Sequence, residues 1–247
     1  MNRFFLDKNQ IVGNKVLFPL DISHQIRHVL RLDKGDQVAV LDNSGFVYQV
    51  QLELTPNQSS VQGIIMDSKI EQSEPVVKLA LCFGLTSRDK VEWILQKATE
   101  IGVSEFFPFV SSRTLVQSTS LSDKKQLRWQ RIIREASEQS HRGCLPNLNP
   151  PMDYKDCVLS LVTRFDKCLL AWEKASPLAE YHRQLDKNAR ESSIGLFIGP
   201  EGGFSEEEVD FAQSKGCEVV SLGARILRME TAAIVLPAII LYQVEDL

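Results

Sequence analysis

The feature that most constrains the fold is a change in hydrophobic pattern near residue 75. Before that point, short β-branched segments alternate with turn-forming residues, whereas after it strand-like apolar segments alternate with segments of helical periodicity. Strands separated by helices are typical of a mostly parallel α/β sheet. The polar stretch IEQSEP at residues 70–75 has no periodicity and ends in a proline, which makes it the predicted linker. We therefore predict two domains, residues 1–72 and residues 73–247.

The first domain is predicted to be a small β-rich unit. Its strands are expected within the segments KVLFPL, DQVAVLDNSGFVYQVQLEL and SVQGIIM. Residues 43–45, Asn-Ser-Gly, have the composition of a hairpin loop, and residues 34–36, Lys-Gly-Asp, that of a turn leading into a strand.

The second domain is predicted to be built from alternating strands and helices. Strands are expected at residues 78–85, in the segment FFPFV, and at residues 169–173, 194–199 and 219–223. Helices are expected at residues 91–101, 121–141, near 177–190, after Ser205, and at 231–241. Ser205 and Glu208 have the spacing of a capping box, and Gly102 is expected to end the first of these helices.

Composition and charge exclude several classes of protein. The chain is 43% hydrophobic and 24% charged, as in an ordinary globular protein, and its net charge of -4 argues against a protein that coats nucleic acid nonspecifically. The longest apolar run, residues 231–241, is too short to span a bilayer, and Asp7 and Lys8 interrupt any apolar signal segment. The five cysteines are odd in number and form no C-x-x-C pair, so no disulfide framework or metal site is predicted. We expect a reduced cytoplasmic protein.

The segment GPEGGFS at residues 199–205 lies between a predicted strand and a capped helix. Its glycines allow a ligand to approach the backbone, and the helix that follows offers free N–H groups. The segment lacks the lysine and Ser/Thr of a P-loop and does not match G-x-G-x-x-G. The alternative interpretation is a plain strand-to-helix turn.

A second segment, SLGARILRMETAA at residues 221–233, also joins a strand end to a helix start. It places two arginines and Glu230 at the predicted carboxyl edge of the sheet, where ligands of open α/β sheets bind. Alternatively, Arg228 and Glu230 form a surface ion pair without any function. Two such loops after neighbouring strands favour a ligand site.

Together these segments resemble the RsmE family, the SPOUT-class enzymes that methylate N3 of a uridine in 16S ribosomal RNA. The resemblance extends over the whole chain, including RFF at residues 3–5, KATEIGV at 97–103 and EQS at 138–140. It implies a trefoil-knotted SPOUT α/β methyltransferase domain behind a small N-terminal PUA-like β-barrel that binds RNA. It also implies a homodimer that acts on ribosomal RNA, within the small ribosomal subunit. The usual rules of chain connection would argue against a knot.

The resemblance further implies S-adenosylmethionine as cofactor, bound by three loops. The cofactor-binding residues that it implies are Leu170, Ala171, Trp172, Ile198, Gly199, Pro200, Glu201, Gly202, Gly203, Leu222, Gly223, Ile226, Leu227 and Arg228. Uridine N3 is a poor nucleophile until its imide proton leaves, and Glu230 is the predicted proton acceptor. Arg228 or Arg113 is predicted to stabilise negative charge on the uracil oxygens. The alternative is that Glu230 is only a structural partner of an arginine.

Candidate RNA-binding residues come from two basic regions. Residues 113–142 contain seven basic and three acidic residues, and i,i+4 pairs account for part of that charge, leaving Arg128 and Arg142 without such a partner. The other region is a basic cluster in the first domain, which is equally consistent with a solvated strand face. The predicted RNA-binding residues are Arg3, Arg27, Arg31, Arg128 and Arg142.

The leading prediction is therefore an S-adenosylmethionine-dependent ribosomal RNA uridine-N3 methyltransferase. One alternative is a SPOUT methyltransferase acting on a ribose 2'-hydroxyl or another base, which the cofactor loops alone do not exclude. Another is a non-catalytic RNA-binding factor in ribosome assembly. The intact GPEGG and ILRMET segments favour an enzyme.

Overall fold

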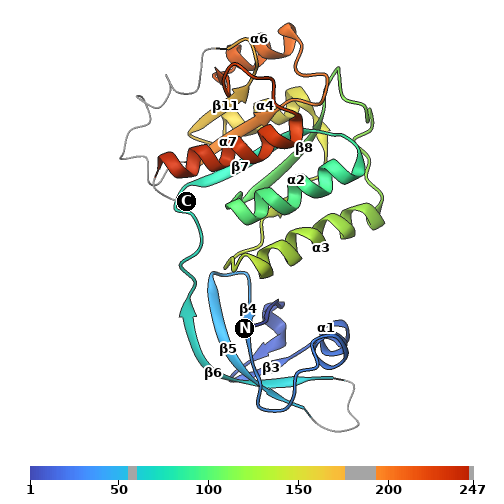
Figure 1. Cartoon of the computed structure of the whole chain (residues 1–247), viewed down its shortest axis with the longest axis vertical. Helices are drawn as coiled ribbons and strands as arrows, with labels where there is room; N and C mark the ends of the chain where they lie inside the picture. Colours follow the sequence, from blue (N-terminus) through green and yellow to red (C-terminus); the bar gives the residue numbers. More distant parts are fainter. Residues whose placement is uncertain (55–59, 176–192, 245–247) are drawn as a thin grey trace. The chain divides into compact units, whose positions relative to one another are not determined.

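The computed structural model describes residues 1–54, 60–175 and 193–244, and its contacts divide the chain into two units (Figure 1). The first unit consists of residues 1–74 and 137–145, and the second of residues 75–136 and 146–247. The division after residue 74 lies close to the predicted linker, but nothing in the sequence pattern indicated that residues 137–145 group with the first unit. The helix predicted near residues 177–190 lies outside the described residues.

The first unit contains one six-stranded sheet with the strand order β1-β4-β5-β6-β3-β2. Its strands are β1 (Arg3–Phe5), β2 (Ile11–Val12), β3 (Lys15–Leu17), β4 (Gln37–Leu41), β5 (Phe46–Glu53) and β6 (Gln62–Ile70). The predicted hairpin is confirmed, since β4 and β5 pair antiparallel and both Asn43 and Gly45 adopt positive φ. Gly35, with φ 96°, forms the predicted turn before β4.

The first unit also contains a helix that was not predicted. A short 3-10 turn, η1 (Lys8–Gln10), precedes β2, and after β3 the helix α1 (Leu20–His24) continues into the π-type turn η2 (Gln25–Val29). Ile22 and Ile26, four residues apart, bury their side chains in the same core as Phe4 and Val50. This helix therefore covers the core of the sheet.

The second unit is built on a parallel sheet, which confirms the predicted α/β class. Its strands are β7 (Lys78–Gly84), β8 (Glu105–Val110), β9 (Asn147–Leu148), β10 (Met152–Asp153), β11 (Lys167–Ala171), β12 (Ser193–Ile198) and β13 (Glu218–Val220). The strand order is β10-β8-β7-β12-β11-β13, with β9 beside β8, and the paired strands run parallel. The loops after β7, β8, β11, β12 and β13 consequently meet at one edge of the sheet.

Helices cover both faces of this sheet (Figure 1). The helices α2 (Arg88–Ile101), α3 (Asp123–Gln139) and α7 (Met229–Gln243) pack on one face, and α4 (Tyr154–Val162) and α6 (Glu206–Ser214) on the other. Neighbouring strand residues such as Leu81 and Cys82 belong to opposite cores, as the two-residue period of a strand requires. Within the described ranges, every helix falls short of the length and apolar character that a bilayer crossing requires.

Two helix ends bear out the sequence signals. The capping box of α6 is present, with the Ser205 hydroxyl accepting from the Glu208 N–H and the Glu208 carboxylate accepting from the Ser205 N–H. Gly102 ends α2 with φ 126°, a conformation that other residues rarely adopt. Of the helices in this unit, α4 was missed, although Asp153 caps its first turn by accepting from the Lys155 N–H.

Candidate active site

Loops at the carboxyl edge of the sheet enclose a cavity of about 500 Å³. This volume lies within the range of small-molecule sites, roughly 300–1,000 Å³. With one exception, every predicted cofactor-binding residue lines it. The lining residues are Lys90, Ala171, Trp172, Glu173, Ile198, Gly199, Pro200, Glu201, Gly202, Gly203, Phe204, Ser221, Leu222, Gly223, Arg225, Ile226, Leu227, Arg228, Met229, Glu230 and Ala232. Three loops that are far apart in the sequence thus form one site.

The exception is Leu170. Leu169 and Leu170 are both fully buried, and they point into the cores on opposite faces of the sheet. Leu170 belongs to the core beside α4 and α6 and is absent from the cavity lining, because successive side chains of a strand alternate. On this strand the cavity lining therefore consists of Ala171 and Trp172, and a contact of the cofactor with Leu170 stays a prediction.

Glycine has different functions at four positions of the site. Gly203 and Gly223 have φ 67° and 112°, and a Cβ atom at either would meet nothing within 4 Å, so these positions open onto free space. A Cβ atom at Gly199 would lie 3.1 Å from the Phe204 ring, and one at Gly202 would lie 3.0 Å from Arg113 Cβ. The first two glycines leave room beside the backbone, and the other two permit close packing of the loop.

Glu230 lies in the first turn of α7 and lines the cavity. Its Oε2 atom is buried and has no hydrogen-bond partner among the described residues. Among the described residues, the nearest cation is Lys90, whose Nζ lies 3.9 Å from Oε2, beyond hydrogen-bonding distance. Arg228 precedes the helix as its N-cap residue and also lines the cavity. Within the described ranges, the ion pair of Glu230 is made with a lysine and not with the arginine that was considered.

Lys90 and Thr86 were not predicted. Lys90 Nζ lies 3.0 Å from Glu201 Oε1, and the Thr86 hydroxyl donates to the same oxygen. Burial acts to raise the pKa of Glu201, but the hydrogen bonds from Thr86 and Lys90 outweigh it and lower the pKa from its ordinary value. Both residues follow β7 at the carboxyl edge of the sheet, so the argument that identified the other loops also applies to this one.

Arg113 contacts the glycine loop but does not line the cavity. Its Nη1 donates to the carbonyl oxygens of Gly202 and Phe204, at 3.1 and 3.2 Å. These contacts support residues 202–204 from outside the lining. Arg113 therefore holds the loop through Nη1, and its predicted contact with a uracil oxygen stays a prediction.

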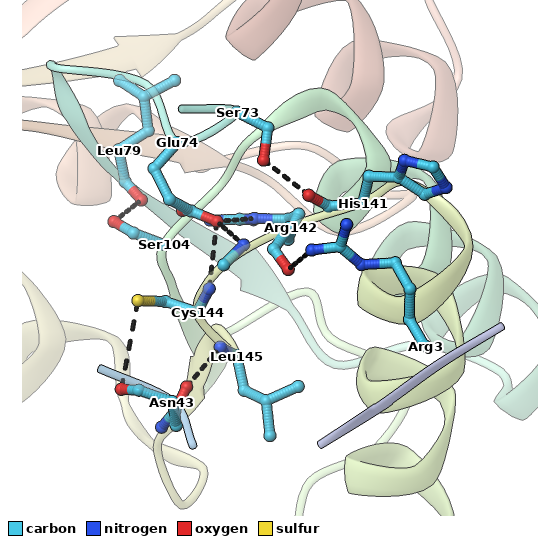
Figure 2. Close-up of polar contacts among 11 residues, drawn as sticks. Arg3, Asn43, Ser73, Glu74, Leu79, Ser104, His141, Arg142, Cys144 and Leu145 are labelled. Atoms are coloured by element: carbon cyan, nitrogen blue, oxygen red, sulfur yellow. Dashed lines mark hydrogen bonds and ion pairs between the residues drawn. The ribbon is translucent and has the colours of Figure 1, made fainter. Parts of the chain in front are cut away.

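Two of the predicted RNA-binding arginines are buried in ion pairs of the first unit, of which Figure 2 shows the pair between Arg142 and Glu74. Only 4% of the Arg142 side chain is exposed, and its Nη2 lies 2.7 Å from Glu74 Oε2. Arg3 is 8% exposed, with Nη2 2.6 Å from Glu71 Oε2. Because neither guanidinium group is accessible to a phosphate, Arg3 and Arg142 are corrected from RNA-binding to structural residues.

Arg128, which has no i,i+4 partner on its own helix, pairs with an acidic residue of α2. Its Nη2 lies 2.7 Å from Glu92 Oε2, and this hydrogen-bonded pairing holds the pKa of Glu92 at about 2. Half of the Arg128 side chain is nevertheless exposed. Arg27 is half-buried and Arg31 is exposed. These three arginines remain candidates for RNA contact.

Comparisons with known proteins identify the family. A family model described as an RNA methyltransferase domain matches residues 72–241. The chain is 33% identical to ribosomal RNA small subunit methyltransferase E of Bacillus subtilis over 99% of its own length and 98% of that protein. This protein belongs to the ribosomal RNA small subunit methyltransferase E family. The resemblance that the sequence motifs carried is thereby confirmed.

Solved structures agree with this assignment. A ribosomal RNA small subunit methyltransferase E from Neisseria gonorrhoeae bound to S-adenosylmethionine is similar with a TM-score of 0.85 and 28% identity, covering 98% of this chain and 97% of that one. A methyltransferase from Legionella pneumophila in complex with the same cofactor has a TM-score of 0.84 and 25% identity, covering 97% and 96% of the two chains. In the part of this chain that the structure describes, no cluster of three or more His, Cys, Asp or Glu could hold a metal ion.

Proposed function

We propose that this protein uses S-adenosylmethionine to methylate N3 of a uridine in 16S ribosomal RNA. The observation that carries the proposal is the single cavity formed by the loops after β11, β12 and β13, in a chain of this family. The cofactor-bound relative with a TM-score of 0.85 supports the choice of cofactor. The family to which the chain belongs supports the choice of substrate.

The residues of the cavity fit S-adenosylmethionine. Its apolar lining, including Ile198, Leu222 and Leu227, suits the adenosyl group, and the open space at Gly203 and Gly223 lets a ligand reach the backbone. We assign its binding to the lining residues of 171–172, 198–203 and 222–228. When bound, the cofactor supplies a methyl group attached to a positively charged sulfur.

The protein's own contribution is alignment and the handling of one proton. The N3–H bond of uracil must break for N3 to become a good nucleophile. Glu230 offers a carboxylate oxygen with no hydrogen-bond partner in the described residues, so it is the proposed acceptor of that proton. Arg228 lines the same cavity and supplies positive charge for the uracil oxygens.

The knot of the second unit, the barrel of the first unit and the assembly of the chain are proposed together with this function. We propose a trefoil knot in the second unit, supported by the family to which the chain belongs. We also propose that the sheet of the first unit is a PUA-like RNA-binding barrel, and that the protein acts as a cytoplasmic homodimer on RNA of the small ribosomal subunit. Light scattering tests the dimer, because a stable and fully active monomer would contradict it.

Nucleoside mapping by mass spectrometry tests the function directly. Cells that lack the gene should lose one 3-methyluridine from 16S ribosomal RNA, and the wild-type gene should restore it. An unchanged pattern of methylated nucleosides would overturn the proposal. Loss of a ribose methylation or of a different base methylation would overturn the assignment to uridine N3.

A further inference from the structure

One lysine links two of the loops that form the cavity. Lys90 lies in the first turn of α2 and places its ammonium group between two carboxylates. Nζ lies 3.0 Å from Glu201 Oε1 in the glycine loop and 3.9 Å from Glu230 Oε2 in the first turn of α7. The loop after β7 is thus joined through Lys90 to both of the segments that the sequence motifs identified.

The two carboxylates depend on Lys90 to different degrees. Glu201 also accepts a hydrogen bond from Thr86, so it keeps a partner when the lysine is removed. Glu230 Oε2 has no hydrogen bond among the described residues, and Lys90 is the cation that lies within 4 Å of it there. Two carboxylates that share one cation repel each other once that cation is lost. Removal of Lys90 is therefore expected to displace Glu230 more than Glu201.

We propose that Lys90 is the positioning residue of this site and acts by holding the Glu230 carboxylate where it can accept a proton from the substrate. The inference rests on the proposed function, in which Glu230 is that acceptor. Lys90 also lines a second cavity of about 500 Å³, which it shares with Glu230, Trp93, Ile234 and Val235. The Lys90–Glu230 pair thus lies on the wall common to two cavities, where a shift of either side chain changes the access of water and substrate to the carboxylate.

The chain offers a closely matched control. Lys97 lies on the same helix and pairs with Glu100 at 2.8 Å, with 33% of its side chain exposed, compared with 34% for Lys90. Lys97→Met removes the ion pair with Glu100, and Lys90→Met removes the ion pairs with Glu201 and Glu230, from lysines that are about one-third exposed. An effect confined to Lys90→Met therefore comes from the position of that lysine beside the two carboxylates.

The first measurement separates turnover from binding. Lys90→Met should lower kcat about 10-fold or more with little change in KM for the RNA, because it disturbs a group that acts on the reacting proton. Calorimetric binding of S-adenosylhomocysteine should weaken by less than about 5-fold, as for the loss of partly exposed ion pairs. Lys97→Met should leave both quantities within about 2-fold of wild type. Lys90→Arg should restore most of the turnover, and Lys90→Gln provides a second neutral variant if the methionine variant unfolds.

The second measurement asks whether Lys90 acts through Glu230. The Lys90→Met/Glu230→Gln double variant should turn over no more than about 3-fold more slowly than Glu230→Gln alone, because residues that act as a unit are not additive. Fully additive losses, or normal turnover of Lys90→Met beside an active wild type, would overturn this inference and leave the proposed function intact. A wild-type protein that methylates no ribosomal RNA would overturn the proposed function and, with it, the inference.

Discussion

The carboxylates of Glu74 and Glu230 differ in how many hydrogen bonds they accept. In the first unit, the Glu74 carboxylate accepts hydrogen bonds from Arg142 Nη2 at 2.7 Å and from the backbone N–H groups of Gly143 and Cys144 at 2.8 and 3.1 Å (Figure 2). In the second unit, Glu230 Oε2 is buried with no hydrogen bond in the described residues. A carboxylate whose oxygens already accept several hydrogen bonds has little capacity to accept a proton and stabilises the structure. A carboxylate oxygen without a hydrogen bond is available to accept a proton from a substrate.

The largest effect is expected from removing the Glu74 carboxylate, which accepts several hydrogen bonds. Glu74→Ala should destabilise the first unit by about 3 kcal/mol, because it removes a carboxylate that pairs with the buried Arg142 guanidinium and accepts two backbone N–H groups. Hydrogen exchange of peptides from residues 37–53 and 137–145 measures this local stability. The matched variant Glu135→Ala, which removes an exposed partner of Arg131, should change exchange little. Equal protection from exchange in the two variants would contradict a structural role for Glu74.

The next effect is expected from Glu230→Gln, which keeps the shape of the side chain and removes its capacity to accept a proton. Turnover should fall on the order of 10²-fold or more, with cofactor affinity and protein stability little changed. The deficit should shrink at higher pH, where more of the uracil is already deprotonated. Single-turnover methyl transfer between pH 7 and 10 measures both effects. Near-normal turnover at neutral pH would eliminate Glu230 as the base and leave arginine electrostatics as the explanation.

The contribution of Glu74 to stability should depend on pH. Burial acts to raise the pKa of Glu74, but hydrogen bonds from Arg142 and from the backbone at residues 143 and 144 lower it below its ordinary value of 4.5. The stabilisation by Glu74 should be fully present above pH 4.5 and be lost as the pH falls through the lowered folded-state pKa. Urea denaturation from pH 7 to pH 3 should show this loss in the wild type and a smaller one in Glu74→Gln. Parallel curves for the two proteins would contradict it.

The smallest effect is expected from Arg128→Ala. The pair with Glu92 is half exposed on the arginine side, so its loss should change the stability of the protein little. If Arg128 contacts a phosphate, RNA affinity should fall uniformly across sequences, and the slope of log affinity against log salt should decrease by about one. Fluorescence anisotropy at several salt concentrations measures the slope. A slope equal to that of the wild type would assign Arg128 to structure, like Arg142.

Helices and strands were predicted correctly where neighbouring residues mark their beginning, their end or their hydrophobic period. The capping box at Ser205, the helix stop at Gly102 and the hairpin at Asn43 were all predicted from neighbouring residues. The helices α1 and α4 were missed, because α1 has five residues and Pro150 and Pro151 obscure the apolar spacing just before α4. Short helices stabilised mainly by packing leave a weak periodic signal.

Contacts between distant residues account for the errors at the site. Arg3 and Glu71 are 68 positions apart, as are Arg142 and Glu74, so the search for i,i+4 partners did not find these ion pairs. Lys90 and Glu201 are 111 positions apart. The glycine-rich and charged segments after two strands, residues 199–205 and 221–233, predicted a ligand site, and the resemblance to the family added the cofactor and residues 170–172. Lys90 belongs to a helix whose residues resemble an ordinary charged surface.

The return of residues 137–145 to the first unit has a consequence for how this protein can be divided. The backbone passes between the two units after residues 74, 136 and 145, and Leu145 packs in a small core with Phe5, Leu41 and Val47. No single cleavage of the polypeptide therefore releases either unit whole. A truncation at the linker would remove Leu145 and Arg142 from the first unit. Both residues would then lie on the remaining fragment without their packing partners. The two units should therefore be produced together, in one polypeptide.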